Sequence, residues 1–346
     1  MKDMKKLIFL FTILPFIGNA QNYQIDLSKA NQQKIPSPTI WSNVKETILQ
    51  IPDTLKLQGE VVSMTKDGER IIVSDAFYKI LIFDKNGKFM YQLTTPVSEY
   101  KDKQESKSQN RFLDTEQNLF FKDAFSHWIG IDLKTGKIMK RIQKPTKYKN
   151  KISDFRQIKN GNYISYVNNQ SGMEKSLFII FDEKGQIKYT EPNKSVYVKA
   201  LQDKPYNMGD YYSYLSNDYC HEPHGGMTVY QIKEDRLLPH ITFRLGTHTP
   251  IDMNKEMDLF NKTNNNQWII SRVYESNRHI YFSYTAEQKY YWGYYDKMNK
   301  KTYIGIGIPQ KAYERGVQFP LFYNGIKALT YQKQGNSIKV RIGELL

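Results

Sequence analysis

The feature that most constrains the fold of this chain is a turn that recurs about every 50 residues. An aspartate followed by lysine and a Gly appears in FDKNGK, IDLKTGK and FDEKGQ, with weaker copies in YQIKEDR and YDKMNKK. The first three aspartates, Asp84, Asp132 and Asp182, are 48 and 50 residues apart. Asp side chains accept hydrogen bonds from nearby backbone N–H groups and Gly tolerates positive φ, so we expect these aspartates to be structural.

A second pattern, a strand followed by a polar turn and another strand, precedes each of these turns. Six such hairpins occur, in VVSMTKDGERIIVS, RFLDTEQNLFFK, DFRQIKNGNYISYV, YYSYLSNDYCH, WIISRVYESNRHIYFSY and LFYNGIKALTYQ. Four-stranded units repeated at this period are typical of a β-propeller, in which each blade covers the apolar face of the next. The sequence therefore predicts an all-β fold, a six-bladed β-propeller of four-stranded antiparallel blades.

The last unit has one strand too few. It ends in SIKVRIGELL, which supplies only a third strand. The segment TIWSNVKETILQIP, residues 39–52, is predicted to add the fourth, outer strand and so to close the ring, because an open ring would leave exposed sheet edges. We expect a lead-in over 21–38 and the propeller over 39–346.

Residues 1–20 have the layout of a secretory signal peptide. Lys2, Lys5 and Lys6 precede the apolar run LIFLFTILPFIG, and the small residues GNA follow. We expect cleavage after Ala20 and export to the periplasm or outside the cell. The apolar run has twelve residues, too few to span a bilayer, and no other segment is apolar enough, so no membrane span is predicted.

Composition limits the partners and the sources of stability. The net charge is +15, but the lysines are spread over turns such as KNGK and KTGK, with no basic helix or nucleic-acid motif. We therefore interpret them as solvated turn residues and predict no nucleic-acid partner. The single cysteine, Cys220, excludes an intramolecular disulfide, so packing and strand pairing must stabilise the chain, which we expect to be a monomer.

Several stretches resemble a known family. The runs FDKNGKFMYQL, LQIPDTLKLQGEVVSM and YYWGYYDKMNKKTY, and the stretch EPHGGMTVYQIKEDRLLPHITFRLG, are similar to bacterial six-bladed β-propellers of the NHL-like type, which are common among exported proteins of gut-type bacteria. The resemblance covers roughly residues 45–346. It implies the propeller fold and export, and it implies little about activity, since many such proteins have none assigned.

Propellers bind ligands at the mouth of their central channel, where the loops between the second and third strands of each blade meet. These loops are predicted at 75–79, 123–127, 168–175, 221–226 and 285–289, with long interblade loops at 94–110, 190–210 and 247–267. Aromatic faces suit sugar rings, and His suits a proton, a metal or a hydroxyl. Our candidate ligand-binding residues are Tyr78, His127, His221, Glu222, His224 and Tyr274.

Two interpretations of the HEPHGG loop remain open. His221 and His224, with His127 from another blade, could ligate a divalent metal, since imidazole suits Zn or Mn. The alternative is a polar loop whose side chains bond the backbone. No cofactor is predicted, and a divalent metal is kept as the alternative.

The sequence favours a non-catalytic protein over an enzyme. No H-E-x-x-H, G-x-S-x-G, P-loop or C-x-x-C motif is present. We predict a binding or scaffold propeller that holds a glycan, a peptide or a cell-surface protein at the channel mouth. The alternatives are a metal-assisted polysaccharide lyase or lactonase-like hydrolase, by analogy of fold alone, and an assembly part of a surface complex.

Overall fold

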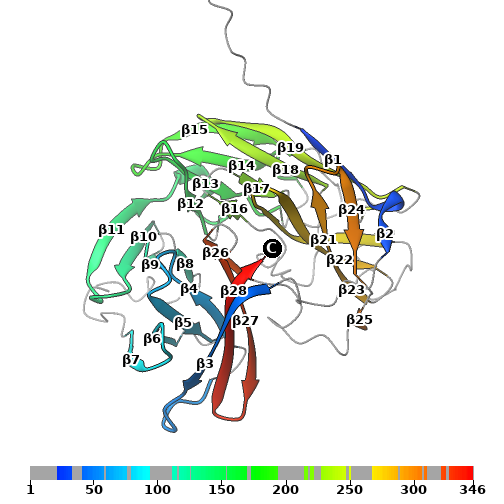
Figure 1. Cartoon of the computed structure of the whole chain (residues 1–346). Helices are drawn as coiled ribbons and strands as arrows, with labels where there is room; N and C mark the ends of the chain where they lie inside the picture. Colours follow the sequence, from blue (N-terminus) through cyan, green and yellow to red (C-terminus); the bar gives the residue numbers. More distant parts are fainter. Residues whose placement is uncertain are drawn as a thin grey trace, which may run out of the picture.

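The chain folds into a ring of six antiparallel sheets around one axis (Figure 1). A computed structural model describes residues 22–32, 41–57, 60–75, 79–93, 111–114, 117–124, 126–152, 154–169, 173–193, 214–216, 219–221, 227–246, 249–250, 267–286, 289–305, 308–309, 321–324 and 327–345. The six-bladed, all-β prediction is confirmed. Residues 1–20, the expected signal peptide, lie outside the described residues.

Blades 1 to 3 are self-contained, each built from four consecutive strands. Blade 1 contains β4 (Val61–Met64), β5 (Arg70–Ser74), β6 (Ile80–Asp84) and β7 (Phe89–Gln92). Blade 2 contains β8 (Arg111–Asp114), β9 (Leu119–Ala124), β10 (His127–Asp132) and β11 (Ile138–Gln143). Blade 3 contains β12 (Arg156–Gln157), β13 (Tyr163–Tyr166), β14 (Ser176–Phe181) and β15 (Ile187–Pro192), and the 3₁₀ turn η4 (Thr146–Tyr148) precedes it.

Blades 4 to 6 each include, besides their own strands, one strand from residues 22–50. Blade 4 contains β16 (Tyr214–Ser216), β17 (Tyr219–His221), β18 (Thr228–Lys233) and β19 (Arg236–Arg244). Blade 5 contains β21 (Gln267–Glu275), β22 (His279–Ala286), β23 (Lys289–Asp296) and β24 (Lys301–Ile304), with the short strands β20 (Thr249–Pro250) and β25 (Ile308–Pro309) paired at its margins. Blade 6 contains β26 (Leu321–Asn324), β27 (Lys327–Gln334), β28 (Ser337–Leu345) and β3 (Trp41–Gln50).

Strand β3 closes the ring as the outer strand of blade 6. It pairs antiparallel with β28, from Gln50 opposite Ser337 to Trp41 opposite Leu345. The buried side chain of Leu49 joins the apolar cluster between blades 6 and 1. The predicted closure by 39–52 is thus confirmed, with the strand itself spanning Trp41–Gln50.

The lead-in that precedes β3 adds two further edge strands that the sequence analysis did not predict. Strand β1 (Tyr23–Asp26) pairs parallel with β19 of blade 4, and after the 3₁₀ turn η1 (Leu27–Lys29), β2 (Asn31–Gln32) pairs parallel with β24 of blade 5. Residues 22–50, which we call the N-terminal arm, therefore fasten the outer edges of blades 4, 5 and 6 in turn (Figure 1).

The recurring aspartates are turn residues, as the sequence predicted. One carboxylate oxygen of Asp84 accepts hydrogen bonds from the backbone N–H groups of Asn86 and Lys88, both at 2.9 Å. The same arrangement recurs at Asp132, Asp182 and Asp296. These carboxylates hold the outer turns through hydrogen bonds from the backbone.

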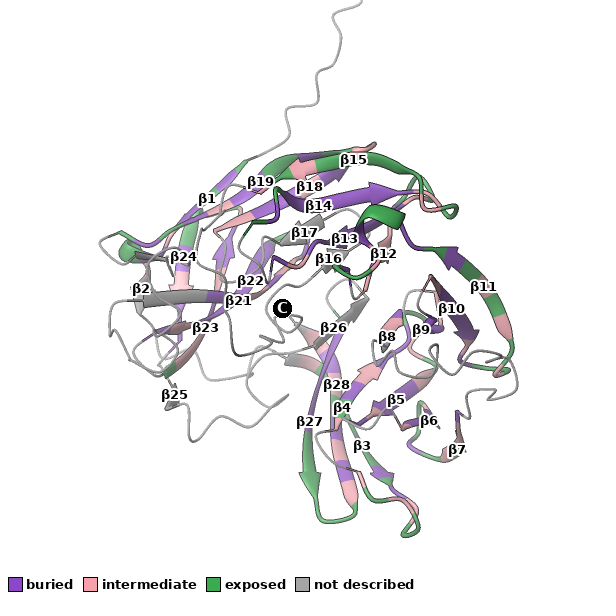
Figure 2. Cartoon of the chain, turned by 180° about the vertical axis from the view of Figure 1, so that it is seen from behind, coloured by how far each residue is buried: buried purple, intermediate pink, exposed green. Residues whose placement is uncertain are grey.

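Apolar clusters join neighbouring blades. Five clusters are formed by the described residues, and they lie between blades 1 and 2, 2 and 3, 3 and 4, 4 and 5, and 6 and 1. The middle strands bury both faces, as β14 does along its whole length. Outer strands such as β15 contain only half-buried and exposed residues (Figure 2). Among the described residues, no such cluster joins blade 5 to blade 6.

Candidate functional site

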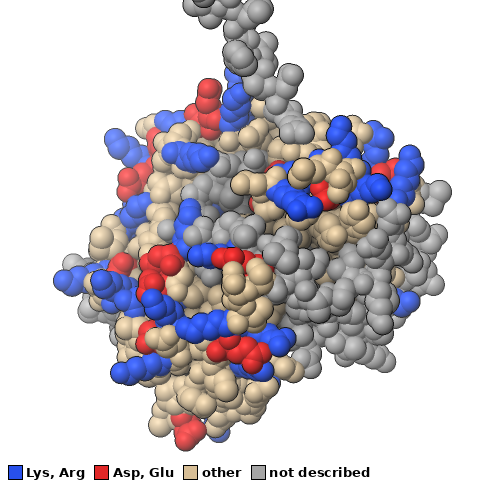
Figure 3. All heavy atoms as spheres, in the orientation of Figure 1, with Lys and Arg blue, Asp and Glu red and all other residues tan. Residues whose placement is uncertain are grey.

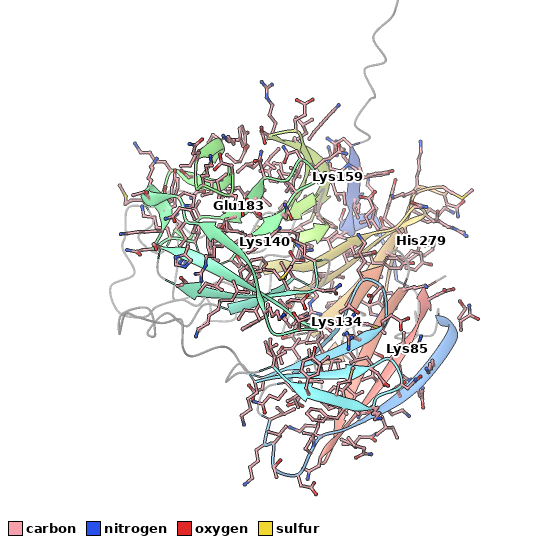
Figure 4. All side chains as sticks on the ribbon, turned by 90° about the vertical axis from the view of Figure 1, so that its left-hand side faces the viewer. Lys85, Lys134, Lys140, Lys159, Glu183 and His279 are labelled. Carbon is pink, nitrogen blue, oxygen red and sulfur yellow. The ribbon has the colours of Figure 1, made fainter. Side chains whose placement is uncertain are left out.

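Topology separates two kinds of connection. Since the strands of each blade alternate in direction, the turns after the first and third strands lie at one end of the blade, and the loop after the second lies at the other. In Figure 4, Glu183 of the outer turn of blade 3 lies apart from the other labelled turn residues, next to blade 2, whereas Lys85, Lys159 and His279, in turns of blades 1, 3 and 5, lie toward one side of the ring. The predicted ligand loops therefore belong to the opposite side, which we call the mouth.

Four of the predicted site residues cannot be placed by their side chains. Tyr78, Glu222 and His224 lie outside the described residues. His221 is the last residue of β17, with its backbone opposite Val229, so it ends the second strand of blade 4 at the mouth.

His127 begins β10 directly after the mouth loop of blade 2, as predicted. Its Nε2 lies 3.2 Å from Nη1 of Arg141, and its Nδ1 lies 3.2 Å from the Ser126 hydroxyl. A guanidinium can only donate, so in this contact Nε2 accepts and the ring proton sits on Nδ1, toward Ser126. The half-buried imidazole is therefore held in one tautomer and one orientation.

A polar groove of about 790 Å³ opens beside His127. Blade 2 contributes one wall and the outer turn of blade 3 the other. The lining residues are His127, Arg141, Gln143, Asp182, Glu183, Lys184 and Gln186. Its side chains supply cationic, amide and carboxylate groups within one concave surface, which suits a ligand with several hydrogen-bonding groups.

The second wall is fixed by a close backbone approach. The N–H of Gln143 donates to the carbonyl of Glu183 at 2.9 Å. A Cβ at Gly185, which has φ +75°, would lie 2.9 Å from the carbonyl oxygen of Gln143. Only Gly allows the outer turn of blade 3 to sit this close to β11.

Within the groove, Asp182 is occupied by its own turn. Burial alone would raise the pKa of this carboxyl, but the bonds from Lys188 and from the N–H groups of Gln186 and Lys184 lower it below its usual value. The Asp182 carboxylate is therefore an anion whose charge is stabilised by hydrogen bonds within its own turn, and its role in the groove is to hold that turn in place.

A buried ion pair supports the floor of the mouth loop in blade 2. Lys144 Nζ lies 2.5 Å from Asp123 Oδ1, with both side chains at most 4% exposed. The same ammonium lies 4.9 Å from the centre of the Trp128 ring. The Lys144 N–H donates to the carbonyl of Ser126, so this pair fixes the backbone that presents His127.

Tyr274 lies elsewhere. It is the penultimate residue of β21, opposite Tyr281 of β22, close to the turn that joins these strands. That turn is at the end of the blade away from the mouth loops. The structure therefore does not bring Tyr274 together with His127.

Sequence reasoning missed the partners of His127. Arg141 follows an outer turn and lies in no sequence motif. The other groove wall, 182–186, carries the aspartate turn pattern, which the sequence analysis interpreted as structural. No group of three His, Cys, Asp or Glu side chains with metal-binding geometry occurs among the described residues. Because His221 and His224 are not described at the side-chain level, this finding does not test the predicted metal ligands.

Charge on the described surface is mixed. On the face in Figure 3, Lys and Arg side chains are interspersed with Asp and Glu. Within the described part of the chain, no helix is long and apolar enough to cross a membrane.

Comparison with protein families adds one assignment. The model of the family described as "Domain of unknown function (DUF4934)" matches residues 22–328. The chain belongs to this family. The DUF4934 match starts at the N-terminal arm and ends in blade 6, at the beginning of β27. No functionally curated protein matches the chain.

Solved structures share the propeller fold of this DUF4934 protein. A protein of Bacteroides fragilis NCTC 9343 that is predicted to be exported matches with a TM-score of 0.59 and 15% identity, over 94% of this chain and 99% of that one. The β-propeller domain of a Myceliophteria thermophila protein (Swd1) matches with a TM-score of 0.45 and 9% identity, over 86% and 99%. An oligogalacturonate lyase in complex with manganese matches with a TM-score of 0.40 and 9% identity, over 87% and 91%. At 15% identity the Bacteroides fragilis match shows the fold alone, and the other two, with TM-scores below 0.5, carry no argument.

Proposed function

We propose that this protein is an exported, NHL-like propeller that binds a glycan, a peptide or a cell-surface protein at its mouth without catalysing a reaction. One observation supports this most directly: a groove lined by polar residues opens beside His127, which follows the mouth loop of blade 2, and its other wall is the outer turn of blade 3. The turns at the other end of the blades repeat one Asp-centred arrangement, whereas the mouth loops differ in sequence from blade to blade.

The chemistry of the groove favours binding over reaction. His127 is neutral when its Nε2 accepts from Arg141, and Asp182 is held by backbone N–H groups. Neither group is arranged to activate a nucleophile, since a general base needs a proton to take within hydrogen-bond reach. The groove instead offers donors from Arg141 and Lys184 and the amides of Gln143 and Gln186.

The binding test uses the chain without residues 1–20. The protein is screened on arrays of defined oligosaccharides and of peptides, and the strongest hit is titrated by calorimetry. We expect the double variant His127→Ala/His224→Ala to weaken this binding by about tenfold or more, as loss of buried polar contacts does. Lys159→Ala, on the opposite side of the ring, should bind normally.

Two results would refute this proposal. Undiminished affinity in the folded double variant would remove His127 and His224 from the site. A folded protein that binds nothing on either array would contradict a glycan- or peptide-binding role at the mouth.

Export is tested separately. Mass spectrometry of the native protein should find a mature N-terminus at Gln21 in the periplasmic or secreted fraction. Intact Met1 in the cytoplasm would contradict it.

A further inference from the structure

The junction between blades 5 and 6 differs in chemistry from the other five. On β22, Ile280, Phe282 and Tyr284 belong to the apolar cluster shared with blade 4. Side chains alternate across a strand, so the intervening residues His279, Tyr281 and Ser283 face the other way, toward blade 6. This second face of blade 5 is polar and aromatic instead of aliphatic.

Four tyrosines cross this face in register. They are direct cross-strand partners from the inner to the outer strand: Tyr274, Tyr281, Tyr294 and Tyr303. With strands about 4.8 Å apart, the row spans roughly 14 Å. The rings of Tyr294 and Tyr303 stack with centroids 4.9 Å apart. Tyr281 is 2% exposed and forms the buried floor, while the other three are half-buried.

A second row lies beside the tyrosines on the mouth side. It runs Arg272, Ser283 and Trp292, again as direct cross-strand partners. The Nη1 atom of Arg272 is buried and has no hydrogen-bond partner within the described part of the chain. A buried guanidinium donor is costly to leave unsatisfied, so its position beside the tyrosine row and in one row with Trp292 indicates a missing acceptor.

The facing side of blade 6 is also polar. Leu329 and Tyr331 of β27 pack toward blade 1, so Thr330 faces blade 5. Lys339 and Arg341 share this face of the sheet and both bond the single carboxylate of Glu46, at 2.8 and 2.7 Å. Two cations on one carboxylate leave this wall with net positive charge.

We propose that this junction, with the tyrosine row of blade 5 and Arg272 at its centre, is a binding site for a short acidic oligosaccharide. Aromatic faces and phenol hydroxyls suit sugar rings, and a guanidinium suits a carboxylate bidentately. Burial raises the pKa of the half-buried Tyr294 phenol, so its hydroxyl stays a protonated donor at physiological pH, while the buried Tyr281 hydroxyl contacts Nδ1 of His279 at 3.2 Å. The N-terminal arm pairs with the outer strands of both blades. The site is separate from the His127 groove and does not depend on it.

The test compares a mannuronic acid trimer with a mannose trimer and with triglutamate, each titrated by calorimetry into the intact chain lacking residues 1–20. We expect the acidic trimer to bind at least about tenfold more tightly than the neutral trimer, as a charged hydrogen bond permits. Arg272→Gln should abolish this preference while leaving the neutral trimer unaffected. Arg236→Gln, an exposed arginine on blade 4, is the matched control and should behave as wild type.

The row that contains Arg272 and Ser283 is tested through the fluorescence of its third member, Trp292. Saccharide binding should change the emission of the wild type, and Trp292→Phe should reduce that change with little loss of melting temperature. Equal affinity for the acidic and neutral trimers, or full affinity in Arg272→Gln, would overturn the proposal. Equal binding of triglutamate would show that the site takes anionic peptides instead. Loss of trimer binding in Arg272→Gln with normal array binding at the mouth would separate this site from the His127 groove.

Discussion

Blades 1 to 3 and blades 4 to 6 complete their sheets in different ways. Each of the first three blades contains four consecutive strands and needs nothing from elsewhere. Blades 4 and 5 carry an added parallel strand on their outer edge, and blade 6 has an outer strand from the other end of the chain. All three additions come from one stretch, the N-terminal arm.

The difference lies in what holds neighbouring blades together. The junction of blades 2 and 3 is aromatic and dense, with Phe155 contacting the rings of Phe121, Trp128 and Tyr163. At the junction of blades 5 and 6, the described residues form no apolar cluster. The arm instead pairs with the outer strand of each of these two blades, β2 with β24 and β3 with β28.

Removing the arm should have the largest effect. Deletion of residues 21–52 removes β1, β2 and β3, opens the ring and exposes the cluster that Leu49 covers. We expect loss of the cooperative thermal transition, followed by circular dichroism. Deletion of 22–32 alone should leave the ring closed and cost roughly 5 kcal/mol, because it removes the buried side chains of Tyr23, Ile25 and Leu27. An unchanged melting midpoint after the longer deletion would contradict closure by the arm.

Glu275 should show how the arm region depends on pH. Its carboxylate accepts from Lys297 at 2.5 Å and from His240 at 2.7 Å, beneath the ring of Tyr23. Burial alone would raise the pKa of Glu275, but these two partners lower it below its ordinary value of 4.5. Its stabilisation is therefore complete above that value and is lost as the pH falls through the folded-state pKa.

We expect Glu275→Gln to lower the free energy of unfolding by about 3 kcal/mol at neutral pH, since it breaks a buried pair. The difference from wild type should shrink as the pH falls below 4.5, measured by urea unfolding at several pH values. Glu69→Gln, in an exposed pair with Lys85, is the control and should cost less than about 1 kcal/mol. A pH-independent difference would contradict the assigned pKa shift.

The smallest expected effect is the difference in stability between alanine variants at two glycines that have the same φ angle. Gly161 of blade 3 and Gly87 of blade 1 both have φ +87°. A Cβ at Gly161 meets nothing within 4 Å, whereas at Gly87 it would lie 2.6 Å from Thr47 and 2.8 Å from the carbonyl of Ile48, both on β3. Gly161→Ala should cost about 1–2 kcal/mol from backbone strain alone. Gly87→Ala should cost at least about 1 kcal/mol more, because it also displaces the closure strand. Equal losses in chemical denaturation would show that the outer turn of blade 1 tolerates a shift of β3.

The repeat made most of the fold predictable. Asp84 and its counterparts mark one turn per blade, and the missing strand of the last unit indicated that residues near Thr47 had to supply it. Strands β1 and β2 were not predicted, because they span four and two residues, pair in parallel and have no turn signal beside them. Their positions depend on contacts with strands more than two hundred residues away.

The candidate site was predictable only in part. Position in the repeat located His127 correctly at the mouth end of blade 2. Its neighbours Lys184 and Gln186 could not be foreseen, because they depend on how the outer turn of one blade approaches the strand of the preceding blade. Tyr274 was grouped with the mouth by its blade, although its place along β21 puts it near the opposite turn.

The pairing of β3 with β28 also affects the order in which the molecule can fold. Gln50 must meet Ser337, so almost the entire chain forms the loop that this contact closes. Contacts between distant residues are reached late, because the entropy of loop closure is lost before the contact forms. Blades 1 to 3 can assemble from local segments, but β3 comes early in the chain and its partner β28 comes last. The ring as a whole therefore closes only after β28 is available, and until then β3 remains an unpaired edge that can associate with other chains.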